Sequence, residues 1–250
     1  MGKAIEANTD IEIIEHNPHW IVVNKPAPLI AHPIPRKVEP SLSEEVRTYA
    51  QQWGYSVDHI SLITRLDRET SGVTLIAIDK AAARIFGKGM HRRSFSKTYQ
   101  AIVFGWPTWD QQHLNLPIIQ QSSIEPCDIW VKQIPHPSGK DASTTLEVLE
   151  RFTYRGQPLS LLKLTPHTGR THQLRVHCQA LGHPIVGDKL YNKEGIHYLE
   201  FIESGWNSNM ERDLICQTHA LHASQLEFAE GIWTWTAPLP RLFTEMLQKT

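Results

Sequence analysis

The sequence has few cysteines and no long apolar run. Its three cysteines (Cys127, Cys178 and Cys216) are far apart, odd in number and without metal-ligand spacing. They favour a reduced, cytoplasmic setting with buried or half-buried thiols. The first 10 residues are polar and contain no apolar region of a signal peptide. No stretch of 18 apolar residues predicts a membrane span, so we expect a cytoplasmic protein with no membrane partner.

Acidic residues are absent from Lys80 to Trp109, although the whole chain carries a net charge of −1 that by itself argues against nucleic acid. The same stretch contains six basic residues: Lys80, Arg84, Lys88, Arg92, Arg93 and Lys97. The first four are spaced by four residues, which places them on one side of a helix, where like charges repel. A phosphate backbone is an anionic partner that matches such a stripe. The alternative is a solvated basic face with no partner.

The expected secondary structure contains more strands than helices, without strict alternation. We expect strands at 11–15, 20–24, 73–78, 97–104, 144–152, 159–164, 221–228 and 232–236. We expect helices at 44–53, from 80 to between 87 and 90 with Asp79 as its cap, at 171–181 and after Pro240. Residues 106–126 are expected to be loop-like, and 194–213, which have no clean period, a mobile insertion. This pattern predicts an α+β fold with a mixed, largely antiparallel sheet. The length fits one large domain or two small ones, and we expect a single domain over 1–250, with 1–10 as a flexible N-terminus.

Asp67 stands between Arg65 and Arg68 in a polar turn, directly before the apolar run 73–78. A carboxylate flanked by cations stays ionised even when neighbouring surface excludes water. This setting suits a nucleophile or an electrostatic stabiliser. The alternative is a charged surface turn that begins a strand.

Arg170 lies at or just before the start of the helix expected at 171–181. A cation there faces the positive end of the helix dipole, so we expect it to have an anionic partner. Leu174 follows four residues later, on the same side of the helix and in an apolar stripe typical of core packing. Histidines 167, 172 and 177 are spaced by five, which argues against a zinc site and favours RNA contact or ordinary surface.

The chain resembles the RluA family of pseudouridine synthases through motifs in the order that the family has. They are Val-Val-Asn-Lys-Pro at 22–26 with Ala-His-Pro at 31–33, Arg-Leu-Asp-Arg-Glu-Thr-Ser-Gly at 65–72, Lys-Thr-Tyr-Gln-Ala at 97–101, the run 169–177, Gly-His-Pro-Ile-Val-Gly-Asp at 182–188, and Leu-His-Ala at 221–223. Several motifs together are far more specific than any one alone. One departure is Thr64, where the family usually has His.

The resemblance implies the pseudouridine synthase fold, with a bent central sheet, flanking helices and a central catalytic cleft. It implies isomerisation of uridine in structured RNA: the base is extruded, its N1–C1′ bond breaks, and C5 bonds to C1′. This reaction needs no cofactor, and the sequence has neither a Gly-rich phosphate loop nor metal-ligand spacing. The motif at 22–26 begins too early to leave room for an N-terminal S4 domain, so we expect the form without one.

The resemblance also assigns roles to individual residues. Asp67 becomes the nucleophile, and Arg170 its ionic partner. Tyr99, inside an expected strand, stacks on the target base, and Leu174 walls the uracil pocket. Arg65 fills the space that the extruded base leaves.

Lys25 is a family marker near the cleft, and the sequence leaves open whether it binds phosphate or holds a loop. The RNA would contact the stripe of Lys80, Arg84, Lys88 and Arg92. Without an S4 domain, we expect recognition of a compact stem-loop in transfer or ribosomal RNA. We expect a monomer.

Two other functions compete with this interpretation. A nucleoside or glycoside hydrolase also works at C1′, but such enzymes usually need two carboxyl groups, and Glu69 is the only acid close to Asp67 in sequence. An RNA-binding protein with a silent site is the other, and the joint presence of Asp67, Tyr99 and Arg170 argues against it.

Overall fold

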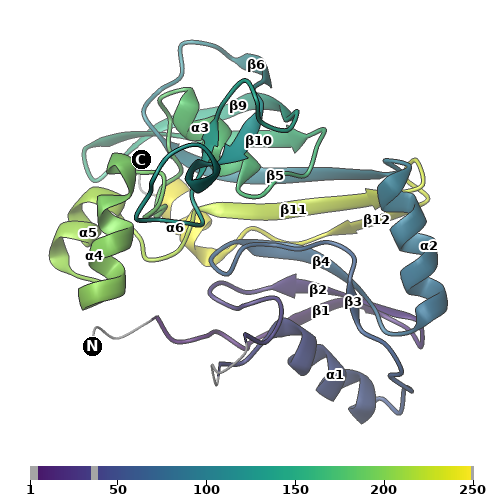
Figure 1. Ribbon diagram of the computed structural model, residues 1–250. Coiled ribbons are helices and arrows are strands. Elements are labelled where there is room, and N and C mark those ends of the chain that lie inside the picture. The colour runs from purple at the N-terminus through teal and green to yellow at the C-terminus, as the bar shows by residue number, and fades with distance from the viewer. Residues whose placement is uncertain (1–4, 35–38, 249–250) are drawn as a thin grey trace. The chain divides into compact units, whose positions relative to one another are not determined.

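A computed structural model describes residues 5–34 and 39–248 of the chain (Figure 1). The chain divides into two compact units. Glu6–Thr98 and His222–Leu239 form what we call the N-terminal unit, and Tyr99–Leu221, with Ile5 and 240–248, forms the second unit. The flexible N-terminus expected at 1–10 lies partly outside the described residues, and the single domain over 1–250 stays a prediction.

The N-terminal unit is built on a mixed sheet in the order β1-β2-β4-β11-β12, with β3 also paired to β4. These strands are β1 (Glu12–His16), β2 (Trp20–Lys25), β3 (Ser61–Leu62), β4 (Ser71–Ala77), β11 (Leu221–Phe228) and β12 (Trp233–Thr236). All of these pairs are antiparallel except β4 with β11. Every residue of β4 is buried, which explains its mostly apolar sequence, in which Ser71 and Thr74 are the polar residues.

Two helices pack on opposite faces of this sheet. Helix α1 (Leu42–Gln52) places Val46 and Ala50 in a core cluster with Ile76 of β4. Helix α2 (Lys80–His91) places Phe86 in a different cluster with Leu75. Successive strand residues point to opposite faces, so Leu75 and Ile76 assign the helices to opposite sides. Asp79 caps α2 by accepting a hydrogen bond from the Ala82 N–H, as the sequence predicted.

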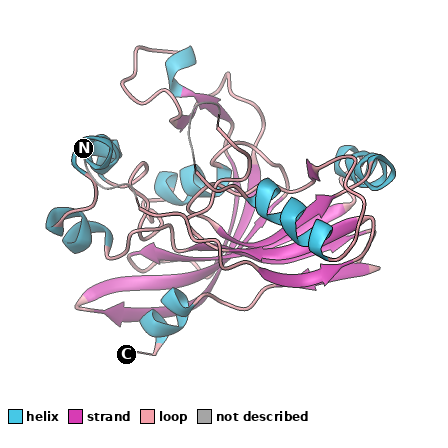
Figure 2. Ribbon diagram, turned by 90° about the horizontal axis from the view of Figure 1, so that it is seen from below, coloured by secondary structure: helices cyan, strands magenta, loops and turns pink. Residues whose placement is uncertain are grey.

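The second unit contains an antiparallel sheet in the order β5-β10-β9-β6. These strands are β5 (Phe95–Phe104, which begins in the N-terminal unit), β6 (Gln111–Asn115), β9 (Ser143–Tyr154) and β10 (Gln157–Pro166), and β7 (Ile118–Gln120) pairs separately with β8 (Gln133–Pro135). The helices are α3 (Gln173–Ala180), α4 (Ile196–Ser204), α5 (Ser208–Leu214) and α6 (Arg241–Leu247), with 3₁₀ turns at Gln121–Ser123 and Lys193–Gly195. Figure 2 distinguishes strands from helices and shows the expected α+β content.

One expectation for this unit is wrong. Residues 106–126 are not simply loop, because they contain β6 and β7. Among the described strands, β6 pairs with β9 alone and ends the sheet order, and its polar residues are typical of a loop.

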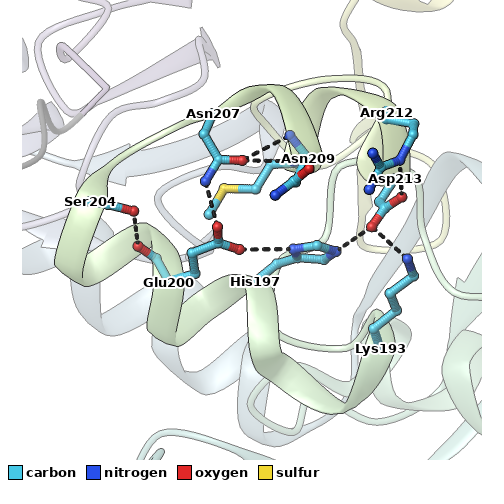
Figure 3. Close-up of polar contacts among 9 residues, drawn as sticks. Lys193, His197, Glu200, Ser204, Asn207, Asn209, Arg212 and Asp213 are labelled. Carbon is cyan, nitrogen blue, oxygen red and sulfur yellow. Dashed lines mark hydrogen bonds and ion pairs between the residues drawn. The ribbon is translucent and has the colours of Figure 1, made fainter.

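Residues 194–213 form α4 and most of α5, two helices that the sequence did not predict. Their expected mobility stays a prediction. The buried His197 of α4 lies between two carboxylates, with Nδ1 3.6 Å from Glu200 Oε2 and Nε2 3.2 Å from Asp213 Oδ2 (Figure 3). Asn207 caps α5 by accepting hydrogen bonds from the next turn's N–H groups. The helical period was hidden because a histidine faces inward while Ile196 and Ile202 are exposed.

Candidate active site

Asp67 lies in the turn between β3 and β4 and is half-buried. The turn closes where the Thr70 N–H donates to the Asp67 carbonyl at 3.1 Å. Arg68 pairs with Glu39, with Nε 2.9 Å and Nη2 2.8 Å from Oε1, while Arg65 is exposed. The two arginines that flank Asp67 in sequence therefore have different surroundings: one is held by an ion pair and the other reaches solvent.

Lys25 is fully buried beneath this turn. Its Nζ donates to the carbonyls of Pro26 at 2.9 Å, Leu29 at 3.0 Å and Arg68 at 3.2 Å. Burial lowers the pKa of Lys25 to about 7, although the nearby Asp67 charge acts to raise it. Because three carbonyls occupy the ammonium, this placement favours the loop-holding interpretation of Lys25 over phosphate binding.

The start of β4 is joined to β11 by a close backbone approach. Gly72 pairs with Ala223 and has a φ of +117°, and a Cβ added there would lie 2.3 Å from the Ala223 carbonyl oxygen. Only glycine fits this position without displacing the strand. Beside it, the Ser71 hydroxyl contacts Nδ1 of the buried His222 at 2.9 Å. Burial lowers the pKa of His222 to about 4, so its ring is neutral at physiological pH. From the sequence, His222 was identified only as part of the Leu-His-Ala motif at 221–223, and no contact was predicted for it.

Arg170 is exposed in the turn before α3, and its Nε donates to the Asp141 carbonyl at 2.9 Å. The turn is held by the buried amide of Gln173, a residue to which the sequence analysis gave no role. Its Oε1 accepts from the Arg170 N–H at 3.0 Å and the Thr168 hydroxyl at 2.7 Å. Its Nε2 donates to the Ser143 carbonyl at 2.9 Å and Thr144 Oγ1 at 3.0 Å. No capping-box pattern marks this glutamine in the sequence, because Gln173 is the first residue of α3 and directly follows the N-cap His172.

Helix α3 is anchored by a buried ion pair. Arg175 contacts Asp188 through Nε–Oδ2 at 2.6 Å and Nη2–Oδ1 at 2.9 Å. Burial acts to raise the pKa of Asp188, but the Arg175 charge together with the hydrogen bonds from Arg175 and the Tyr191 N–H outweighs it, so that pKa lies below the usual range. Leu174 and Cys178 are buried, as the predicted apolar stripe requires. Burial raises the pKa of Cys178 to about 12, so this thiol stays protonated.

The expectation for one of the three spaced histidines is wrong. His177 is fully buried, with Nδ1 2.9 Å from Thr144 Oγ1 and Nε2 3.1 Å from the Leu116 carbonyl, so it is neither surface nor an RNA contact. Within the described ranges, no group of three or more His, Cys, Asp or Glu could hold a metal ion. No helix of the described chain is long and apolar enough to cross a membrane.

The remaining predicted site residues are Tyr99 and the four basic residues of the α2 stripe. Tyr99 is half-buried in β5, where it pairs with Leu164 of β10. Lys80, Arg84 and Lys88 are exposed on α2, and Arg92 is exposed at its C-cap. The N-terminal unit contains Lys25, Arg65, Asp67 and these four basic residues, whereas the second unit contains Tyr99, Arg170 and Leu174. The pairing of Asp67 with Arg170 therefore stays a prediction.

Comparison with known proteins identifies the class of this chain. Residues 19–180 match the family described as RNA pseudouridylate synthase. The dual-specificity RNA pseudouridine synthase RluA of Pasteurella multocida is 37% identical over 181 residues, which cover 72% of this chain and 77% of that protein. RluA of Escherichia coli strain K12 is 36% identical over 183 residues, with 72% and 76% covered. The solved structure of human RNA pseudouridylate synthase domain containing 4 has a TM-score of 0.72 at 26% identity, over 95% of this chain and 92% of that one.

The fold and these matches define an RNA pseudouridine synthase, an isomerase that modifies RNA. The chain belongs to the RluA family of these enzymes. The predicted family, reaction class and α+β pseudouridine synthase fold are confirmed.

Proposed function

We propose that this chain isomerises one or more uridines of a structured transfer or ribosomal RNA, with Asp67 as the nucleophile. The observation that carries the proposal is that Asp67 is half-buried in a turn held by the buried Lys25, whose Nζ donates to the Arg68 carbonyl. Such support holds a reacting group within the narrow geometry that catalysis needs. The dual-specificity name of two relatives supports a search for more than one target RNA.

The reaction conserves every atom of the uridine. The N1–C1′ bond breaks, the base turns, C5 bonds to C1′, the C5 proton leaves, and N1 gains a proton. A carboxylate at the position of Asp67 can serve this sequence by attacking C1′, by attacking C6, or by removing a sugar proton. No electrons are exchanged with another molecule in any of these routes, and no group is added.

The remaining site residues act around the extruded base in this proposal. Arg170 is the ionic partner of Asp67, and Tyr99 stacks on the uracil and removes the C5 proton. Leu174 supplies the apolar wall of the pocket, and Arg65 fills the gap in the RNA stack. Family resemblance supports each role, and the exposure of Arg65 and burial of Leu174 agree with theirs. The enzyme acts in the cytoplasm as a monomer in this proposal.

The test is release of tritium from RNA labelled at uridine C5. We expect wild-type protein to release it, and Asp67→Asn to release none while binding RNA within a few-fold of wild type. Asp58→Asn, the same exchange at an exposed site of the same unit, controls for the loss of one negative charge. Turnover by Asp67→Asn would remove this residue from the nucleophile role. Free uracil among the products would instead support the hydrolase alternative.

A further inference from the structure

The basic helix α2 lies at one end of the N-terminal unit's sheet (Figure 1). The Phe86 ring lies 5.2 Å from the Phe228 ring and 5.5 Å from the Trp20 ring, measured between centroids. Phe228 is the last residue of β11, and Trp20 pairs with Ala77, the last residue of β4. Gly89, one turn further along α2, also approaches Phe228. The helix therefore crosses the sheet where β4 and β11 end.

The Asp67 turn belongs to the opposite end of the same strands. It leads directly into β4, whose first residues pair with the start of β11, Ser71 with His222 and Gly72 with Ala223. The stretch from Gly72 to Ala77 spans about 17 Å at roughly 3.3 Å per residue. Measured along the axis of a DNA duplex, the phosphates of one strand are spaced by about 3.4 Å, so this span corresponds to about five nucleotides or more of duplex length.

The exposed side of α2 carries three basic side chains. Lys80, Arg84 and Lys88 are exposed, and among the described residues none of them forms an ion pair. The Asp79 carboxylate at the N-cap supplies the negative charge that the N-terminus of α2 favours. Like charges four residues apart still destabilise the helix slightly. An anionic partner outside the chain would offset this repulsion.

We propose that Lys80, Arg84 and Lys88 bind phosphates of an RNA helix that flanks the target loop, about five or more nucleotides from the uridine at Asp67. The inference rests on the proposed function, because the distance is counted from Asp67 as the site of reaction. It defines the substrate class: the preferred RNA has a stem that extends past the modified loop. A short hairpin that fills the active site does not reach α2.

The test compares two synthetic RNA hairpins with the same loop, one with a stem of about four base pairs and one of about 16. Binding is measured over a range of salt concentrations for wild type and for the triple variant Lys80→Gln, Arg84→Gln, Lys88→Gln. On the long hairpin, we expect the triple variant to bind at least about ten-fold more weakly at ~0.1 M salt, with a salt slope smaller by about two to three. On the short hairpin, we expect its affinity to stay within about two-fold of wild type, since the three charges make no contact there.

A charge-matched variant separates a local contact from a general field effect. Arg47→Gln, Arg155→Gln, Arg241→Gln removes the same charge from exposed positions elsewhere, and we expect it to bind both hairpins like wild type. The proposal would be overturned if the α2 variant lost as much affinity for the short hairpin as for the long one. It would also be overturned if the charge-matched variant lost as much affinity for the long hairpin as the α2 variant. Tritium release from C5-labelled cellular RNA is measured separately. Failure of wild type there refutes the proposed function, whereas the hairpin comparison alone decides the role of α2.

Discussion

The side-chain oxygen of Gln173 accepts a hydrogen bond from the backbone N–H of Arg170, with 3.0 Å between Oε1 and N. The same buried amide binds Thr168, Ser143 and Thr144, so all of its usual donor and acceptor positions are filled. It ties the turn that carries Arg170 to the start of β9. The backbone position of Arg170 is thus set by the neutral side chain of Gln173, three residues further along the chain.

Replacing Gln173 with Leu leaves four polar groups without this partner. We expect the free energy of unfolding to fall by about 1–3 kcal/mol and turnover to fall with RNA binding largely unchanged. A double-mutant cycle with Arg170→Ala separates positioning from stability, because Gln173→Leu should change kcat little once Arg170 is gone. Gln179→Leu, at an exposed position of the same helix, is the matched control. Additive effects on kcat would contradict a role exerted through Arg170.

Lys25 gives the protein a specific dependence of stability on pH. The pKa of Lys25 is about 7 in the folded protein and about 10.4 in an unfolded chain. Between these values the unfolded chain binds more protons than the folded one, so this group increases stability as the pH rises. We expect the stability of wild type relative to Lys25→Met to grow from pH 7 to pH 9.5, by on the order of 1 kcal/mol per pH unit.

Denaturant titrations of both proteins at each pH measure this difference. Thr64→Val, which exchanges another buried polar side chain beside the same turn, should show no such trend, because threonine does not titrate. A constant difference between wild type and Lys25→Met across this range would contradict the low pKa of Lys25.

The ion pair of Arg175 with Asp188 predicts a dependence of the same sign at acid pH, where stability falls as the pH falls. Replacing Asp188 with Asn leaves the buried guanidinium without its counter-charge, which costs about 3–5 kcal/mol. The pKa of Asp188 is lowered in the folded state, so its contribution is present at neutral pH and is lost as the pH falls below about 4. Urea unfolding of wild type and Asp188→Asn at pH 7 measures the cost of removing the counter-charge. The same comparison at pH 3.5 measures how much of the Asp188 contribution is lost at acid pH.

The control for this prediction is Asp110→Asn, because Asp110 pairs with Arg151 at the surface. Exposed pairs contribute about 0–1 kcal/mol, so this change should have little effect at either pH. An Asp188→Asn protein as stable as wild type at pH 7 would show that α3 does not depend on this ion pair.

Local patterns predicted the elements well where neighbouring residues determine burial and capping. The apolar run of β4, the Asp79 cap of α2 and the helix before Gly182 follow from burial and capping, which neighbouring residues determine. The polar interior of the α4 region was missed, because burial of His197 depends on carboxylates from two helices. Gln173 and His222 were missed as supports for the same reason, since their partners lie far along the chain or in another strand.

Site-resolved mapping of pseudouridine in total RNA, by carbodiimide labelling and primer extension, tests the central claim most directly. Cells without the gene are compared with cells that carry wild type, Asp67→Ala or the Asp58→Ala control. The account predicts that one or a few uridines lose their signal without the gene, and that wild type and Asp58→Ala restore it while Asp67→Ala does not. Restoration of the same sites by Asp67→Ala would contradict Asp67 as the nucleophile.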